Sequence, residues 1–357
     1  MNSAHGSGPP TAASVARVYD VAAAAVPSGA TAAADGASAA LRLHVSYVKT
    51  CLLDAAARSS TTPARFALAD VACGRGQDML KLGHAMRNSG KVCRALYCSD
   101  ISTGALGEAE RMAEDTLRPR GVPCVCMEAD ATAPDADLVP PTEGADVVVC
   151  HLALHYWCDS TDRVLRFFHN AARACAGPHA LLVTSFADGR WVVRHGRNRL
   201  SQEHGHGCVA PETVAFTVGP FSVAIAAAHL ETDGGKSATP FGAAYQFSLG
   251  SDRLHGSAEF LVHEGCVEAL ARKAGWLPVY SKRFDEAAAG FACGVPNPHF
   301  AAIAAKMGAD PAGLGEDDVR ALSLFRAKVY ARGEGVGRAF LAALHTCVPA
   351  AGSVVLG

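Results

Sequence analysis

The sequence predicts an α/β protein built on a doubly wound, mostly parallel sheet. Three observations support this prediction: short apolar runs without polar alternation, amphipathic stretches with helical spacing between them, and polar or glycine-rich turns where the two meet. Strands buried on both faces are typical of parallel sheets, because helices cover both sides. The 357 residues are 50% hydrophobic, which suffices for a large core, and such a length predicts about two domains.

The predicted elements begin after a flexible N-terminal segment. Residues 1–40 are rich in Ala, Gly and Ser and lack a clear period. Apolar residues then recur with helical spacing over residues 41–58. Strands are predicted within residues 65–73, 94–102, 122–132, 145–157 and 179–187. Helices are predicted within residues 78–90, 104–121 and 162–177.

The pattern loosens beyond residue 188. We expect a polar loop over residues 194–212, which are rich in His and Gly. The later predicted elements are a strand in 243–250, a helix in 263–275 and strands near 276–284 and 320–332. The apolar window 214–230 contains a Gly-Pro pair and is too short to span a bilayer. Residues 333–357 form a C-terminal extension without a predicted role.

Charge and cysteine content exclude several classes of protein. The net charge of −2 creates no general attraction to nucleic acid or to an anionic membrane, so a polyanion requires a local cluster of Lys and Arg. The 13 cysteines are scattered and form no Cys-x-x-Cys pair, which favours free thiols over a disulfide framework. No secretory signal is recognised. We expect a nuclear or cytoplasmic protein that is monomeric and not bound to membranes.

The stretch DVACGRGQDML, residues 70–80, places two glycines between an apolar strand and a helix. Gly74 and Gly76 permit positive φ and close approach of the backbone to a ligand, although a tight turn without a ligand has the same pattern. Gly-x-Gly-x-x-Gly is not matched, because Met79 occupies the third position, and no phosphate-binding Gly-Lys-Ser/Thr follows.

Three acidic residues stand at successive strand ends: Asp70, Asp100 and Asp130. Carboxylates there accept hydrogen bonds from an ammonium group, a ribose diol and an exocyclic amine, whereas they repel a pyrophosphate. The trio therefore favours S-adenosylmethionine over a dinucleotide. Capping of the following helices is the alternative reading.

Several motifs resemble the mRNA cap guanine-N7 methyltransferases. The glycine loop is similar to the family's Asp-Leu-Gly-Cys-Gly-Lys-Gly-Gly-Asp, and DIS at residues 100–102 to its acidic-Ile-Ser strand end. CHLALHYW (150–157) resembles Ser-Gln-Phe-Ala-Leu-His-Tyr, and AEFLV (258–262) resembles Pro-Glu-Tyr-Leu-Val. TSFADGRWVVRHGR (184–197) and YVKTCLL (47–53) also match family segments.

The resemblance implies a Rossmann-like class I methyltransferase sheet of seven strands, the last one antiparallel. The domain would span residues 41–332, with cap-binding insertions at about 188–300. The implied activity is methyl transfer from S-adenosylmethionine to guanine N7 of the 5′ cap of mRNA. A Lys-x-Asp-Gly nucleotidyl-transfer motif is absent from the sequence, so a guanylyltransferase or an activating subunit is an expected partner, beside the capped RNA.

The family's site residues carry over by position. For the cofactor they are Lys49, Asp70, Ala72, Gly74, Asp100, Ile101, Asp130, His151 and Tyr156. For the capped guanine and its phosphates they are Arg75, His155, Tyr156, Glu259 and Phe325. This sequence departs from the family at four of these positions. Ala72 stands where the family has Gly, Arg75 where it has Lys, His151 where it has Gln, and Phe325 where it has Tyr. No general base is implied, because guanine N7 carries a free lone pair and positioning is the main catalytic lever.

Other readings stay open. His151 and His155 have the spacing of a zinc pair, but a third ligand is not evident and no metal is expected. The EHGHGC run (203–208) is interpreted as a polar loop, and Arg190, Arg194, Arg197 and Arg199 as a solvated helix face rather than an RNA-binding edge. The alternatives for function are a small-molecule methyltransferase on the same fold and an inactive cofactor-binding scaffold subunit.

Overall fold

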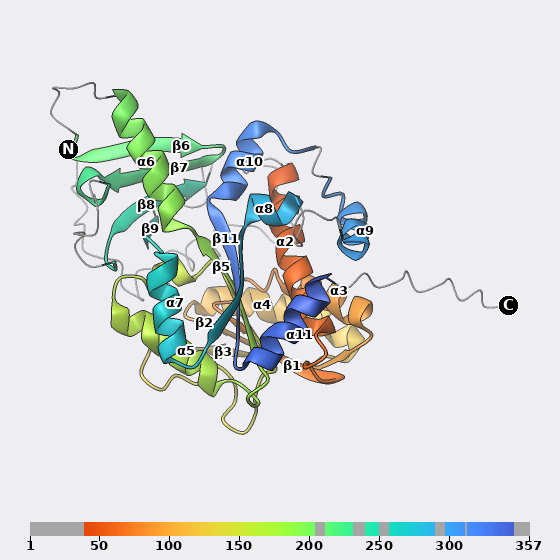
Figure 1. The fold of residues 1–357 in the computed structure, drawn as a ribbon. Helices are drawn as coiled ribbons and strands as arrows, with labels where there is room; N and C mark the ends of the chain where they lie inside the picture. Colours follow the sequence, from red (N-terminus) through yellow and green to blue (C-terminus); the bar gives the residue numbers. More distant parts are fainter. Residues whose placement is uncertain are drawn as a thin grey trace.

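A computed structural model describes residues 39–203, 211–230, 240–249, 257–289, 297–310 and 313–345. Figure 1 shows a large central sheet covered by helices and a smaller sheet at one side. The predicted flexible segment 1–40 lies almost wholly outside the described residues, as do the EHGHGC run beyond Glu203 and the chain after His345.

The central sheet has seven strands in the order β10-β11-β5-β4-β1-β2-β3. Its strands are β1 (Arg65–Val71), β2 (Val92–Asp100), β3 (Cys124–Glu128), β4 (Val147–His151), β5 (Leu181–Ala187), β10 (Leu277–Arg283) and β11 (Phe325–Ala331). β1 to β5 pair in parallel, while β11 runs antiparallel to both β5 and β10. The predicted doubly wound sheet with an antiparallel last strand is confirmed.

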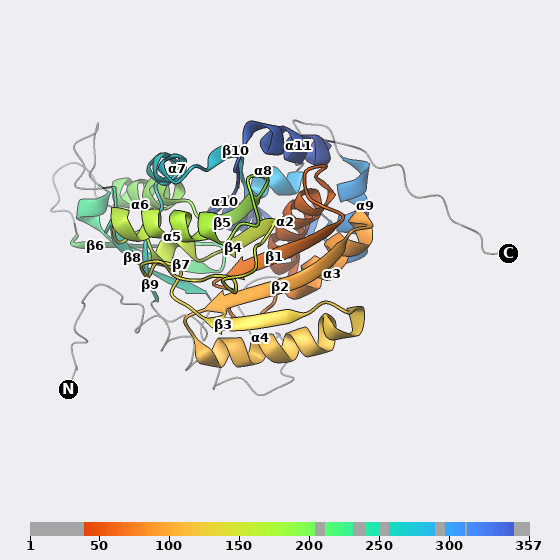
Figure 2. The same ribbon diagram turned by 90° about the horizontal axis from the view of Figure 1, so that it is seen from below.

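Helices cover both faces of this sheet, which explains why its inner strands lack polar alternation. On one face lie α2 (Ala39–Arg58), α3 (Met79–Ser89) and α4 (Thr103–Thr116), on the other α5 (Thr161–Arg173) and α7 (Glu264–Lys273). Leu52, Leu82 and Ala109 belong to one buried apolar cluster, whereas Phe167 and Val267 belong to the other. In Figure 2 the arrowheads of β1 and β2 point toward the side of the molecule where the second sheet lies.

The second sheet is antiparallel, in the order β6-β7-β8-β9. Its strands are β6 (Thr213–Val218), β7 (Phe221–Ala226), β8 (Ala244–Leu249) and β9 (Ser257–Phe260). The apolar window at 214–230 is therefore mostly a β-hairpin, whose turn is the Gly-Pro pair, with Gly219 at φ +56°. Buried and exposed residues alternate along β6, as expected for a sheet with one solvated face.

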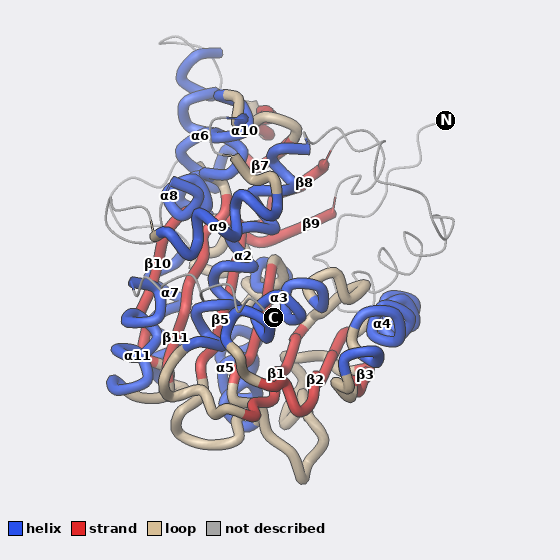
Figure 3. Tube along the Cα trace, turned by 90° about the vertical axis from the view of Figure 1, so that its right-hand side faces the viewer, coloured by secondary structure: helices blue, strands red, loops and turns tan. Residues whose placement is uncertain are grey.

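Some sequence predictions beyond residue 188 are wrong. The loop expected from residue 194 is helical up to Glu203, because α6 (Gly189–Glu203) packs against β6; Gly196 lies where an added Cβ would come within 2.8 Å of Leu230. Four further helices were not predicted. They are α8 (Phe284–Ala289), α9 (Pro298–Met307), α10 (Glu316–Ser323) and α11 (Glu334–His345), and α10 takes the first residues of the strand predicted near 320–332. Figure 3 shows the second sheet beyond one end of the large sheet's strands. None of the helices within the described ranges is long and apolar enough to cross a membrane.

Candidate active site

The glycine loop after β1 is built from positive-φ residues. Ala72, Gly74 and Gly76 have φ of 55°, 53° and 75°. A Cβ on Gly76 would lie 2.8 Å from Met79 Cε and 3.1 Å from the Ala109 backbone, whereas one on Gly74 would meet nothing within 4 Å. Gly76 is thus required by packing against α4, and Gly74 leaves room above the loop. Ala72 adopts a left-handed conformation that costs a non-glycine residue about 1–2 kcal/mol.

Asp100 fixes this loop at the end of β2. One carboxylate oxygen accepts a hydrogen bond from Gly74 N at 2.8 Å, and the other accepts from Ser102 N at 2.9 Å. Ser102 then caps α4 by accepting from Ala105 N, and the half-buried Ile101 lies between the two. Asp100 therefore ties the glycine loop to the N-terminus of α4.

Asp130 stands two residues beyond β3. Its Oδ1 accepts from the backbone N and the hydroxyl of Thr132, at 2.8 and 2.7 Å. The alternative reading, capping of the following helices, does not describe these two carboxylates: Ser102 caps α4, while Asp100 and Asp130 hold the backbone of their own loops.

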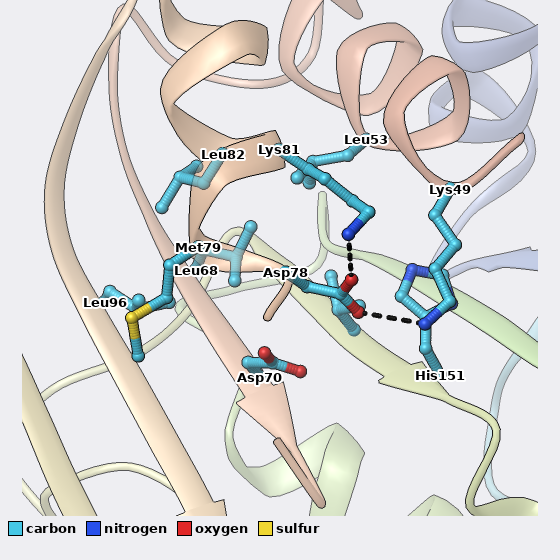
Figure 4. Close-up of a pocket in the computed structure, with 11 residues that line it drawn as sticks. Lys49, Leu53, Leu68, Asp70, Asp78, Met79, Lys81, Leu82, Leu96 and His151 are labelled. Carbon is cyan, nitrogen blue, oxygen red and sulfur yellow. Dashed lines mark hydrogen bonds and ion pairs between the residues drawn. The ribbon is translucent and has the colours of Figure 1, made fainter. Parts of the chain in front are cut away.

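A pocket lies between α2, α3 and the ends of β1 and β4. Asp70, Lys49 and His151 line it together with Asp78 and Lys81 (Figure 4). Lys81 Nζ lies 2.7 Å and Lys49 Nζ 3.3 Å from the Asp78 carboxylate. Burial raises the pKa of Asp78, but the two ammonium groups outweigh it and hold that pKa below its ordinary value. Asp70 lacks such close partners, and burial, followed by the charge of Asp78, raises its pKa.

Lys81 and Asp78 were not among the predicted site residues. The letters were visible, since Asp78 precedes α3 and Lys81 lies in its first turn. What the sequence did not reveal is that the Asp78 carboxylate accepts a hydrogen bond from Lys49, which lies 29 residues earlier in α2. The pocket thus presents two cations and two carboxylates, a set suited to a zwitterion.

His151 ends β4 in the same pocket. Its Nδ1 lies 2.9 Å from the Ser185 hydroxyl, and burial, followed by the charge of Lys49, lowers its pKa to about 3. The ring is therefore neutral at physiological pH. His151 and His155 are in no metal-type cluster within the described part of the chain, so the structure gives the zinc reading no support.

A second polar cluster forms where the two sheets approach each other. Glu259 of β9 is 3% exposed, and its carboxylate lies 3.5 Å from His155 Nε2. Tyr245, opposite Glu259 in β8, donates its hydroxyl to Glu259 Oε2 at 2.5 Å. The Tyr156 ring lies edge-on to His155 with centroids 4.3 Å apart. Tyr245 was missed, because its role depends on strand register rather than on a local motif.

His155 is the residue of this cluster that points most clearly to a ligand. Burial lowers its pKa to about 3, so it is neutral. Its Nδ1 is buried and has no hydrogen-bond partner among the described residues. An orphaned buried polar atom costs free energy, and such atoms in native structures are typically satisfied by a ligand or water.

The two remaining predicted substrate residues lie in different surroundings. Arg75 is half-buried in the glycine loop, and its Nε lies 3.5 Å from the Glu108 carboxylate. Phe325 is buried at the start of β11, where its ring contacts Phe221 at 5.3 Å and Phe284 at 5.9 Å between centroids. Trp157 is an ordinary core aromatic, packed 4.6 Å from Phe167, whereas Tyr156 belongs to the polar cluster.

A comparison with protein families decides the identity of the domain. The model of the mRNA (guanine-N(7))-methyltransferase domain matches residues 36–327. The chain belongs to this family. It is an S-adenosylmethionine-dependent methyltransferase, and the family resemblance of its motifs is confirmed. A search of curated proteins found no match.

Solved structures similar to the chain include methyltransferases. One is an S-adenosylmethionine-dependent methyltransferase from Clostridium acetobutylicum ATCC 824, with 12% identity, 75% of this chain and 84% of that chain covered, and a TM-score of 0.36. The CcbJ methyltransferase from Streptomyces caelestis is 13% identical, the match covers 89% of this chain and 95% of that chain, and the TM-score is 0.41. An S-adenosylmethionine-dependent methyltransferase from Mesorhizobium loti is 14% identical, the match covers 76% of this chain and 94% of that chain, and the TM-score is 0.40.

The pocket chemistry fits S-adenosylmethionine. Lys49, Lys81 and Asp70 line one pocket, and their charges complement the carboxylate and ammonium groups of that molecule. The open space above Gly74 leaves the loop accessible.

Proposed function

We propose that this methyltransferase acts on guanine N7 of the 5′ cap of mRNA. The observation that carries the proposal is the buried Glu259–His155–Tyr245 cluster beside the carboxyl ends of the strands. The family match supports the same substrate. A buried carboxylate with a neutral imidazole is complementary to the Watson–Crick edge of guanine, which offers an N–H and an amino group to one acceptor.

The reaction requires positioning rather than acid–base chemistry. When bound, S-adenosylmethionine supplies an electrophilic methyl group on a sulfonium. Guanine N7 has a free lone pair, so no side chain needs to remove a proton. Lys49 and Asp70 would hold the methionine end, Asp100 the ribose and Asp130 the adenine. Fixing the base against the donor is worth several orders of magnitude in effective concentration.

Glu259 also contributes electrostatically. The guanine ring gains positive charge as its N7 is methylated, and a carboxylate facing that ring stabilises the developing cation. The Tyr156 ring, which packs on His155, would add an aromatic face, and Phe325 would stack on the cap from β11. Tyr245 and His155 hold the Glu259 side chain in place before the reaction.

Arg75 would contact the cap phosphates from the glycine loop. A guanidinium binds two phosphate oxygens at once, so the replacement of the family's Lys preserves the charge and changes the geometry. We propose that the enzyme is a monomer, takes the capped 5′ end of an RNA as substrate, and depends on a separate guanylyltransferase, in the nucleus or the cytoplasm.

The test is transfer of a labelled methyl group to a GpppG-capped RNA, with an ApppG-capped RNA as the control. We expect methylation of the first RNA only, with N7-methylguanine after nuclease digestion. Tight binding of S-adenosylhomocysteine without transfer to any cap would instead indicate a scaffold subunit. Transfer to small molecules but not to the cap would overturn the substrate while leaving the enzyme class intact.

A further inference from the structure

Three cysteines outside the site described above come together on neighbouring strands. Cys98 lies in β2, and Cys124 and Cys126 lie in the edge strand β3. Cys98 is directly opposite Cys126 in the parallel register. Residues two apart on a strand share a face, so all three thiols project to the same side, where they pack against the apolar cluster that contains Ala109 of α4. Figure 2 shows α4 running along β3.

The distances between the sulfur atoms suit a bound cation. Sγ of Cys98 lies 3.9 Å from Sγ of Cys124, which lies 4.0 Å from Sγ of Cys126, and all three sulfurs fall within 4.8 Å of one another. Metal–sulfur bonds of about 2.3 Å place two sulfurs about 3.8 Å apart in tetrahedral geometry and about 4.0 Å apart in trigonal geometry. The spacing therefore needs little adjustment to bring three sulfurs onto one ion.

The donor set selects the kind of ion. Among the described residues the group consists of three sulfurs without a carboxylate or imidazole, which favours thiophilic ions over Mg²⁺ or Ca²⁺. Cys98 is fully buried, whereas Cys124 and Cys126 are half-buried, so an ion can enter from the side of β3.

We propose that Cys98, Cys124 and Cys126 form a three-sulfur site for one soft d¹⁰ cation, Zn²⁺ or Cu⁺. Three protein ligands leave a further position for water on Zn²⁺, while Cu⁺ is satisfied by three sulfurs. The site is independent of the substrate proposed above. It adjoins the cofactor loop, because Cys73 N donates to the carbonyl oxygen of Ser99, the residue after Cys98, at 3.1 Å.

The experiment is a Cd²⁺ titration of the full-length protein, reduced and freed of metal, followed by the charge-transfer absorption of Cd²⁺ thiolates. We expect one strong equivalent in the natural sequence and in Cys175→Ser, a half-buried cysteine outside the cluster. Cys124→Ser and Cys126→Ser should each weaken that equivalent more than about 100-fold, since loss of even an outer-shell partner costs about 10–100-fold. Circular dichroism of the metal-free proteins verifies that the variants fold.

Two results would overturn the proposal. One is equal Cd²⁺ affinity in the natural sequence and in a folded Cys124→Ser,Cys126→Ser double variant. The other is failure of both Zn²⁺ and Cu⁺ to displace the Cd²⁺. Displacement by either ion supports the site, and the free concentrations of Zn²⁺ and Cu⁺ that displace Cd²⁺ rank its affinity for the two ions.

Discussion

Glu259→Gln separates the charge of the proposed guanine pocket from its shape. Glutamine has the same size and keeps an oxygen for the Tyr245 hydroxyl, which now binds Oε2 at 2.5 Å. The other carboxylate oxygen, Oε1, lies 3.5 Å from His155 Nε2. In the glutamine variant the carboxylate charge is lost and an amino group takes the place of one oxygen. Alanine is a poorer probe, because it would leave the buried Tyr245 hydroxyl without its acceptor, at a cost of about 1–3 kcal/mol.

The expected effect follows from the loss of one charged hydrogen bond. Such a bond contributes about 1.5–3 kcal/mol, and about 1.4 kcal/mol corresponds to a tenfold change. We therefore expect kcat/KM for GpppG-capped RNA to fall about 10- to 150-fold, while the Kd of S-adenosylhomocysteine changes less than about twofold.

The assay is steady-state methyl transfer combined with calorimetric titration of S-adenosylhomocysteine. The matched control is Glu316→Gln on α10, whose side chain is 92% exposed, and it should leave both quantities unchanged. Unchanged kcat/KM in Glu259→Gln, or an equal loss of S-adenosylhomocysteine affinity, would refute the assignment of this carboxylate to guanine.

Three further predictions concern the cofactor side and stability. Asp100→Asn should weaken S-adenosylhomocysteine binding more than about tenfold by calorimetry, because the amide accepts more weakly from both the loop and the ribose; unchanged affinity would contradict its role. Burial lowers the pKa of His151 and of His155 to about 3 in the folded protein, so their contribution to stability is complete above pH 6.5 and is lost as the pH falls toward 3. The loss is at most about 1.4 kcal/mol per pH unit for each ring. In urea titrations, the free energy of unfolding should fall less between pH 7.5 and pH 5.0 in His151→Gln than in the natural sequence. Gly76→Ala should lower the free energy of unfolding by about 1–3 kcal/mol, since a Cβ at φ +75° meets Met79 and Ala109, whereas Gly107→Ala in α4, where a Cβ meets nothing within 4 Å, should not be destabilising.

The sequence was most informative where structure depends on local pattern. Buried strands, the helices between them and the glycine loop carry their signals within a few residues, and the strand-end carboxylates follow from where each strand stops. The β6–β7 hairpin also had a local signal, the alternation of Val214, Phe216 and Val218 with smaller or polar residues around a Gly-Pro turn. The hairpin is hidden in the sequence because the two strands and their turn together form one long apolar window, which resembles a short membrane segment.

What the sequence did not reveal depends on contacts between distant residues. α6 contains Gly196 and the β-branched Val192 and Val193, so its intrinsic helix preference is weak and its helical form depends on packing against β6. Tyr245 faces Glu259 only because β8 and β9 pair in one particular register. The link between Lys81 and Lys49 through Asp78 likewise requires α2 to lie across α3.

The contact that links the chain after β5 to the chain after β9 and to β11 has a kinetic consequence. Gly189 N donates to Val262 O at 3.1 Å, an added Cβ there would lie 2.8 Å from that oxygen, and Arg326 Nε donates to Asp188 Oδ2 at 2.8 Å. In the proposed reaction the central sheet holds the donor, while Glu259 and Tyr245 of the second sheet hold one edge of the purine, so a change in this contact would alter the angle at which lone pair, carbon and sulfur align. A side chain wedged into it would slow turnover at saturation while both ligands still bind normally, a defect that affinity measurements alone would miss.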